Sequence, residues 1–227
     1  MMSARYDEFA DWYHEWVGED ACRDFTCVAT VDALGDVGRG RVLDLACGSG
    51  RVARYLADRG ATVVGVDVSA ALIAKAIEVE RGAPRGIRYL IGDAQDTLWW
   101  DGVPFDGVTC HMGMSDIDNL AAAMDSVRTV LRPGGALSYL IVHPCHPGGG
   151  FGLPSWPPDE GYYWEGWWTT KGAGCRGRVG ANHRTLSTYL NSALDAGLRI
   201  ERVLEPVPPA KPPPKEPNYL LVACRKT

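Results

Sequence analysis

The sequence has 227 residues, a formal net charge of −5 at pH 7, 46% hydrophobic residues and 22% charged residues. These proportions are typical of a soluble globular domain, and no apolar run approaches the roughly 20 residues that a membrane-spanning helix needs. Lys and Arg are scattered along the chain, which argues against a nucleic-acid substrate. We therefore expect one elaborated domain without a membrane or nucleic-acid partner.

The first residues and the cysteines indicate a cellular compartment. Residues 1–8 lack the apolar core of a secretory signal and the Arg- and Ser-rich character of a transit peptide. The seven cysteines are an odd number at irregular spacings, which favours reduced thiols over a disulfide framework. Both observations predict a cytoplasmic protein.

From Gly40 onward, apolar runs alternate with helical patterns, which predicts an α/β fold with a largely parallel sheet. A helix that starts with Ser115 or Asp116 as its N-cap is expected to end at Pro133. The other expected helices cover residues 50–59, 70–79 and 186–194, and the expected strands cover 41–45, 62–66, 87–91, 105–110, 136–142, 198–204 and 219–224.

An aromatic insertion interrupts this alternation after the fifth strand. Seven aromatic side chains lie between Phe151 and Trp168, among many Gly and Pro residues. Disordered segments are poor in aromatics, so this segment is expected to pack on the domain or on a ligand. We divide the single domain, residues 1–227, into N-terminal capping helices (1–39), a cofactor-binding core (40–142), a lid insertion (143–182), and a C-terminal helix and strands (183–227).

A glycine-rich turn follows the first predicted strand. Gly48, Gly50 and Ala53 fit the dinucleotide pattern G-x-G-x-x-G/A, and Asp67 lies 19 residues after Gly48. Glycines allow a ligand to approach the backbone closely, and an acidic residue at the end of the second strand accepts hydrogen bonds from ribose hydroxyls. On this turn alone, an NAD(P)-dependent oxidoreductase is an equal alternative to an enzyme that uses another adenosine cofactor.

Three further features favour S-adenosylmethionine. Asp44 lies inside the first strand, where a pyrophosphate binder would hardly place a carboxylate but where a ligand with an ammonium group can use one. Asp93 follows the third strand, where its carboxylate can accept from the exocyclic amine of adenine. The sequence also shows no separate catalytic domain.

Four segments together resemble class I S-adenosylmethionine-dependent methyltransferases. Their first and second motifs, their adenine-contacting segment and the turn before their fifth strand are similar to Val42–Gly50, Val64–Ser69, Gly92–Gln95 and Leu131–Gly135. The resemblance extends to bacterial, actinomycete-type natural-product methyltransferases through His143-Pro-Cys145, the aromatic segment, residues 183–190 and Glu205-Pro206. It implies a Rossmann-like sheet of order 3-2-1-4-5-7-6 whose seventh strand is antiparallel.

The cofactor implied is S-adenosyl-L-methionine, with S-adenosyl-L-homocysteine as product. The residues expected to bind it are Asp44, Ala46, Gly48, Gly50, Asp67, Val68, Asp93, Ala94, Gln95 and Cys110. Asp67 has an alternative role as a helix N-cap, and Asp93 as a turn residue. Cys47 is expected to fill space in the motif, because methyl transfer from a sulfonium needs no covalent enzyme intermediate.

Two residues are candidates for catalysis. His111 directly follows the fourth strand, where it could accept a proton from the methyl acceptor; its alternative role is structural, hydrogen-bonded to Asp116 or to backbone. Tyr13 lies in a segment that resembles the capping helix of the family, whose tyrosine often borders the cofactor. The residues expected to bind the acceptor are Trp12, His14, His143, Trp156, Trp164 and Trp168, for which ordinary packing is the alternative. His143, Cys145 and His146 lack a fourth ligand, so no metal site is expected.

The sequence thus predicts transfer of a methyl group from S-adenosylmethionine to a small aromatic acceptor. An indole-bearing natural product of secondary metabolism, methylated at carbon or nitrogen, is the first candidate because aromatic side chains offer flat stacking surfaces. O-methylation of a phenol and N-methylation of an amine are alternatives within the class. An NAD(P) oxidoreductase or a non-catalytic cofactor-binding module would be alternatives outside it. The protein is expected to be a monomer or a homodimer.

Overall fold

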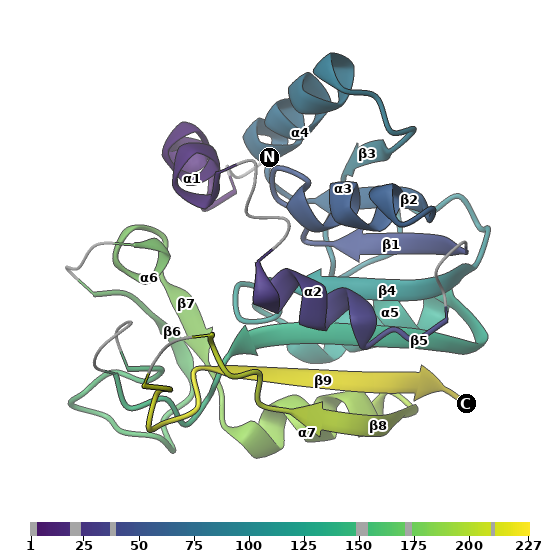
Figure 1. Ribbon diagram of the computed structural model, residues 1–227. Coiled ribbons are helices and arrows are strands. Elements are labelled where there is room, and N and C mark those ends of the chain that lie inside the picture. The colour runs from purple at the N-terminus through teal and green to yellow at the C-terminus, as the bar shows by residue number, and fades with distance from the viewer. Residues whose placement is uncertain (1–3, 19–23, 37–39, 149–153, 171–173, 210–211) are drawn as a thin grey trace.

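A seven-stranded sheet with helices on both faces forms the body of the protein (Figure 1). The structure is a computed structural model, and it describes residues 4–18, 24–36, 40–148, 154–170, 174–209 and 212–227. The strands of this sheet are β1 (Arg41–Leu45), β2 (Thr62–Asp67), β3 (Arg88–Ile91), β4 (Phe105–His111), β5 (Leu131–Val142), β8 (Leu198–Leu204) and β9 (Tyr219–Lys226). Among the described residues, no helix is both long and apolar enough to cross a membrane.

The strand order confirms the predicted topology. The order is β3-β2-β1-β4-β5-β9-β8, in which β8 and β9 are the sixth and seventh strands of the predicted sheet. β1 pairs in parallel with β2 and β4, whereas β9 pairs antiparallel with both β5 and β8. The carboxyl ends of β1, β2 and β4 therefore meet at one edge, which is where ligands bind in open α/β sheets.

The two faces of the sheet bury separate cores because side chains alternate along each strand. On one face, α2 (Phe25–Asp32), α3 (Arg51–Asp58) and α4 (Ala70–Gly82) cover Val42, Val63 and Tyr89. On the other face, α5 (Leu120–Val130) and α7 (Leu186–Asp195) cover Leu43, Val66 and Tyr139. The edge residues of β1, β2 and β4 are consequently held by packing on both sides.

The helix after β4 starts later than predicted. It begins at Leu120 with Asn119 as its N-cap, and neither Ser115 nor Asp116 caps it. Arg184 instead holds the backbone of this segment, because its guanidinium donates to the carbonyl oxygens of Met114 (3.2 Å), Ile117 (2.6 Å) and Asp118 (2.8 Å). Because Arg184 comes from a distant part of the chain, local sequence patterns could not reveal this.

Three elements form the outer rim of the carboxyl edge. The first is α1 (Ala10–Val17), which the short helix η1 (Asp7–Phe9) precedes. The second is a hairpin of β6 (Gly166–Trp168) and β7 (Ala181–His183), and the third is α6 (Cys175–Arg178), which lies between these two strands in the sequence. Figure 1 shows α1 and this hairpin on the left, beyond the arrowheads of β1, β4 and β5. The hairpin lies within the predicted lid (143–182) except for its last residue, His183. Phe151, counted in that lid, lies outside the described residues.

Candidate active site

The glycine turn at the end of β1 has a left-handed backbone. Ala46 (φ 54°), Gly48 (φ 54°) and Gly50 (φ 83°) all have positive φ, and a side chain on Gly50 would overlap the hydroxyl of Tyr89. Met112, just after β4, is the other non-glycine residue with positive φ in the described chain (66°). Strained non-glycine residues at two neighbouring strand ends are typical of a functional site.

Asp67 ties this turn to the end of β2. Its carboxylate accepts hydrogen bonds from the backbone N–H groups of Gly48 and Ser69, each at 2.8 Å. Burial raises the pKa of Asp67, and the two N–H donors oppose this shift. Ser69 is the N-cap of α4, as its hydroxyl oxygen accepts from Leu72 N–H at 3.2 Å. Asp67 is therefore not needed as the cap, and its carboxylate oxygens retain lone pairs for ribose hydroxyls.

Asp44 is a buried carboxyl group with one unused oxygen. Its Oδ1 accepts a hydrogen bond from the Thr109 hydroxyl at 3.1 Å, whereas its Oδ2 has no hydrogen-bond partner. Burial raises the pKa of Asp44 to about 7, although the Thr109 hydroxyl and the backbone of Ala53 oppose the shift. A buried acceptor without a donor is costly, and an ammonium group would satisfy it. The residues at this edge thus fit a cofactor that carries both an adenosine and an ammonium group.

The segment after β3 is organised around Asp93. Its carboxylate accepts from the backbone N–H (2.9 Å) and the side-chain amide (3.0 Å) of Gln95, and its carbonyl accepts from Trp99 Nε1–H at 2.8 Å. Gln95 in turn accepts from Asn119 N–H at 2.8 Å. Ala94 is buried. Asp93 is thus the turn residue that the sequence allowed as an alternative, and its role toward adenine stays a prediction.

The N-terminal helix covers the glycine turn. Tyr13 Cε1 lies 3.5 Å from the position that a side chain on Gly48 would take. The Tyr6 ring packs edge-on against Tyr13, with centroids 5.1 Å apart, and the Tyr6 hydroxyl donates to Asp116 at 2.9 Å. Asp7 accepts from the Ser69 hydroxyl at 2.7 Å. Tyr13 therefore borders the predicted cofactor site, and Asp116 is held by Tyr6 rather than by His111.

His111 stands at the end of β4 beside α2 and α3. Its Nε2 lies 3.0 Å from the Thr26 hydroxyl. Burial and the nearby Arg51 guanidinium lower the pKa of His111 to about 4, although Asp24 opposes this shift. His111 is consequently neutral at pH 7, as a proton acceptor must be. Cys110, the preceding residue, is fully buried. Its sulfur lies beside Gly113, where a side chain on that glycine would also meet Ala46 of the glycine turn.

A second polar group at this edge was not foreseen from the sequence. Burial raises the pKa of Asp116 to about 7, although the Tyr6 hydrogen bond opposes the shift. On α6, the Arg176 guanidinium lies over the Trp168 ring at 5.0 Å, and its Nη1 is buried without a hydrogen-bond partner. The positive charge of Arg176 opposes the rise in the pKa of Asp116, and the charge of Asp116 favours the protonated form of Arg176.

Several predicted acceptor-binding aromatics pack on other side chains of the protein. Trp156 makes edge-on contacts with Tyr162 (5.8 Å) and His183 (5.9 Å), and Trp168 is buried with its Nε1–H donating to Ser155. Trp12 stacks on Trp16, and Arg178 lies over its ring. The described part of the insertion therefore forms a small accessory core. Trp164 and His14 are half-buried, and Val68 is exposed.

His143 takes part in a local turn at the end of β5. Its Nδ1 accepts from Cys145 N–H at 3.0 Å, and its Nε2 lies 3.0 Å from Glu205. In the part of the chain that the structure describes, no three His, Cys, Asp or Glu side chains gather as metal ligands.

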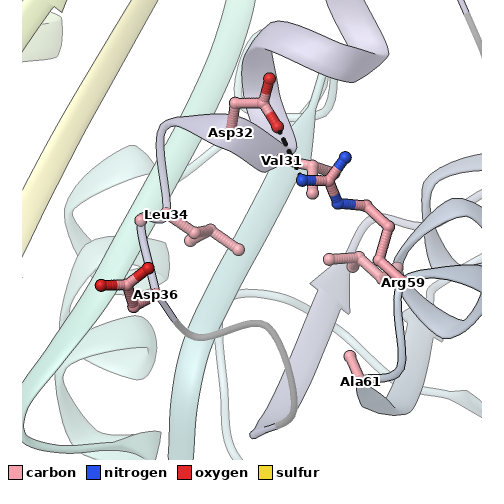
Figure 2. A pocket seen from close by; sticks show the side chains of 8 residues that line it. Val31, Asp32, Leu34, Asp36, Arg59 and Ala61 are labelled. Carbon is pink, nitrogen blue, oxygen red and sulfur yellow. Dashed lines mark ion pairs between the residues drawn. The ribbon is translucent and has the colours of Figure 1, made fainter.

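A hollow of about 260 Å³ lies away from this edge (Figure 2). It is lined by the end of α2 and the turn between α3 and β2, and an ion pair between Asp32 and Arg59 (3.2 Å) borders it. Its residues precede β1 and β2, so it opens at the amino ends of the strands. It has no contact with the glycine turn.

Comparisons with known proteins show which proteins this chain resembles. Residues 42–135 match the family described as "Methyltransferase domain". A demethylmenaquinone methyltransferase of Beutenbergia cavernae is 36% identical over 135 residues, which cover 60% of this chain and 50% of that protein. A ubiquinone biosynthesis O-methyltransferase of Xylella fastidiosa is 36% identical over 101 residues, or 43% of this chain and 39% of that protein. The chain thus spans about half the length of the curated relatives it matches, or less.

A solved structure covers more of the chain. The S-adenosylmethionine-dependent methyltransferase of Mesorhizobium loti superposes with a TM-score of 0.73 at 29% identity, covering 92% of this chain and 100% of that one. The fold and the glycine turn define an adenosine-binding α/β enzyme. These similarities identify residues 42–135 as a methyltransferase domain, and they support the class I S-adenosylmethionine-dependent methyltransferase fold with S-adenosylmethionine as the cofactor.

Proposed function

We propose that this enzyme methylates a small aromatic acceptor at the rim formed by α1, His111 and the β6–β7 hairpin. The observation that carries the methyl-donor part is the buried Asp44 carboxyl, whose Oδ2 has no partner beside the glycine turn. S-adenosylmethionine supplies an electrophilic methyl group on a sulfonium. Asp44 would pair with its ammonium group, Asp67 with its ribose hydroxyls and Asp93 with its adenine amine.

The contribution of the protein is mainly alignment in a dry site. Tyr13 and Tyr6 cover the turn from one side, and the aromatic insertion bounds the rim from the other. Holding two reactants in line removes much of the entropic barrier, and excluding water protects the sulfonium from hydrolysis. The methyl acceptor needs a base only where it must lose a proton, which is the role we assign to His111.

The aromatic rim supports a flat acceptor. Trp12, Trp156 and Trp164 are half-buried, so part of each ring surface is available for stacking. An indole-bearing compound, methylated at carbon or nitrogen, is our first candidate. The named relatives act on demethylmenaquinone or in ubiquinone biosynthesis, so a hydroxylated or quinone-type ring is the second. The proposal includes a cytoplasmic monomer or homodimer without a nucleic-acid substrate.

Two measurements test this proposal. In calorimetric titrations, we expect S-adenosylhomocysteine to bind and NADH to give no heat. In turnover assays with labelled S-adenosylmethionine, we expect methylation within a panel of tryptophan-derived, phenolic and quinol compounds. Turnover confined to phenols or quinols would remove the indole candidate. Heat from NADH alone would overturn the assignment, and tight S-adenosylhomocysteine binding without turnover of any aromatic would point to a binding module.

A further inference from the structure

Three side chains from two distant segments form a hydrogen-bonded chain that ends on His111. Asp24, the N-cap of α2, accepts from the Thr26 hydroxyl at 2.6 Å and from Cys27 N–H at 2.8 Å. Its other carboxylate oxygen accepts from the Arg51 guanidinium at 2.7 Å. The Thr26 oxygen lies 3.0 Å from Nε2 of His111. Thr26 thus stands between a carboxylate and an imidazole.

Counting protons shows which group donates and which accepts in each of these hydrogen bonds. Burial alone would raise the pKa of Asp24, but hydrogen bonds from Thr26 and Cys27 and the charge of Arg51 lower it overall, so Asp24 is ionised. An ionised carboxylate only accepts, and a threonine hydroxyl has one proton. Thr26 therefore donates to Asp24, and its oxygen must accept from an N–H at Nε2 of His111. A neutral imidazole with its proton on Nε2 keeps a lone pair on Nδ1.

We propose that Asp24 and Thr26 hold His111 as its Nε2–H tautomer, so that Nδ1 is the atom that takes the proton of the methyl acceptor. The inference rests on the proposed function, in which His111 is the base. The contact with Thr26 is at Nε2, at the end of β4, and no hydrogen bond to Nδ1 is found among the described residues. In the Nε2–H tautomer, Nδ1 carries the lone pair that can accept a proton. Asp24 and Thr26 act through His111 and are positioning residues.

The proton transfer balances without a further reactant. The proton of the acceptor N–H or O–H moves to Nδ1, and the electron pair of that bond stays on the acceptor atom. That pair forms the new bond to the methyl carbon, while the pair of the carbon–sulfur bond leaves with sulfur. His111 becomes an imidazolium, which the Asp24 carboxylate stabilises through Thr26. The O–H of a phenol or the N–H of an indole becomes strongly acidic as the bond to the methyl carbon forms, so a weakly basic imidazole suffices.

The charged groups around His111 come from two elements. Asp24 on α2 favours the imidazolium, whereas Arg51 on α3 disfavours it. Burial and Arg51 prevail, so His111 remains unprotonated until the pH falls toward 4. The acid limb of kcat should therefore lie below pH 6. Replacing Asp24 with Asn should move it to still lower pH, because the charge that raises the pKa of His111 is lost.

Nitrogen-15 NMR tests the tautomer without any methyl acceptor. The protein has five histidines, and a His111→Gln variant assigns the signals of His111. At pH 7.5 we expect a protonated Nε2 and an unprotonated Nδ1 in the wild type. In Thr26→Val, which keeps the shape but removes the oxygen, we expect a mixture of tautomers. Thr26→Ser should restore the single tautomer. A protonated Nδ1 in the wild type would overturn the proposal.

Turnover provides the second readout. Thr26→Val should lower kcat at least about tenfold, since a positioned base contributes roughly 10²–10⁴, and should leave the Kd of S-adenosylhomocysteine unchanged. The matched control is Thr30→Val on the same helix, whose hydroxyl donates only to the Thr26 carbonyl at 2.8 Å. Wild-type kcat in Thr26→Val would overturn the role of Nδ1. Failure to bind S-adenosylhomocysteine would instead count against the proposed function and would leave the NMR result intact.

Discussion

Asp44→Asn should bind S-adenosylhomocysteine roughly 10–100-fold more weakly than the wild type, because a charge-assisted hydrogen bond in a buried site is worth about 1.5–3 kcal/mol. The variant keeps an oxygen for the Thr109 hydroxyl, which lies 3.1 Å from Oδ1 of Asp44. It loses the negative charge that we expect to face the cofactor ammonium group. Asp125→Asn, an exposed carboxylate on α5, is the matched control and should bind like the wild type.

The same substitution should stabilise the ligand-free protein at high pH. The pKa of Asp44 is about 7 in the folded protein, above the value of about 3.9 for an unfolded aspartate. The contribution of Asp44 to the free energy of unfolding is therefore favourable at low pH and is lost as pH rises through 7. At pH 8, Asp44→Asn removes a buried charge and should gain on the order of 2–4 kcal/mol. Thermal unfolding at pH 5 and pH 8 measures this difference.

The wild-type affinity for S-adenosylhomocysteine should also depend on pH. Below pH 7 the Asp44 carboxyl is protonated, so its pairing with an ammonium group is lost; affinity should rise by up to about tenfold per pH unit toward 7 and then level off. Asp44→Asn should lack this rise. A variant that binds S-adenosylhomocysteine like the wild type at pH 8, or that gains no stability there, would contradict the assigned role of Asp44.

Asp67→Asn should weaken S-adenosylhomocysteine binding roughly 100-fold, which corresponds to about 2.7 kcal/mol. The two carboxylate oxygens of Asp67 accept from Gly48 and Ser69 N–H, each at 2.8 Å, so an amide NH₂ in either place would face a donor. The glycine turn would lose its tie to β2 at the same time as the ribose loses its acceptor. Calorimetric titration measures the loss.

The affinity of Asp93→Asn for S-adenosylhomocysteine should be compared with that of Asp67→Asn. The Asp93 carboxylate already accepts from Gln95, so its replacement should disturb the local turn and cost less affinity than Asp67→Asn. If Asp67→Asn bound S-adenosylhomocysteine within threefold of the wild type, Asp67 would not be the ribose partner. If Asp93→Asn were the weaker binder, the ranking of the two carboxylates would be reversed.

Local patterns predicted the sheet well. The bounds of β1 (Arg41–Leu45) and β8 (Leu198–Leu204) match the expected strands because apolar runs there end at turn residues. β5 begins at Leu131 rather than Ala136, since Leu131 pairs with Phe105 across a register shift. The β6–β7 hairpin and α6 were not foreseen, because only three residue pairs and one helical turn define them.

Long-range hydrogen bonds explain what the sequence could not predict about the site. The predicted cofactor-side residues follow one another within motifs, so spacing alone was enough to propose them. Thr26 and His111 are 85 residues apart, and Tyr6 and Asp116 are 110 residues apart. An Asp directly before a helix is typical of an ordinary N-cap, which Asp24 also is. Only the folded sheet brings α2 to the end of β4.

The position of β9 has a consequence for how the chain folds. β9 lies between β5 and β8, and it pairs antiparallel with both. During synthesis, β5 therefore leaves the ribosome with an unpaired edge whose buried side chains include Leu140 and Ile141, and β8 has no neighbour until β9 follows. Pairing strands that are distant in sequence is slow, and exposed apolar edges promote aggregation. The nascent chain should thus depend on chaperones until Tyr219–Lys226 closes the gap.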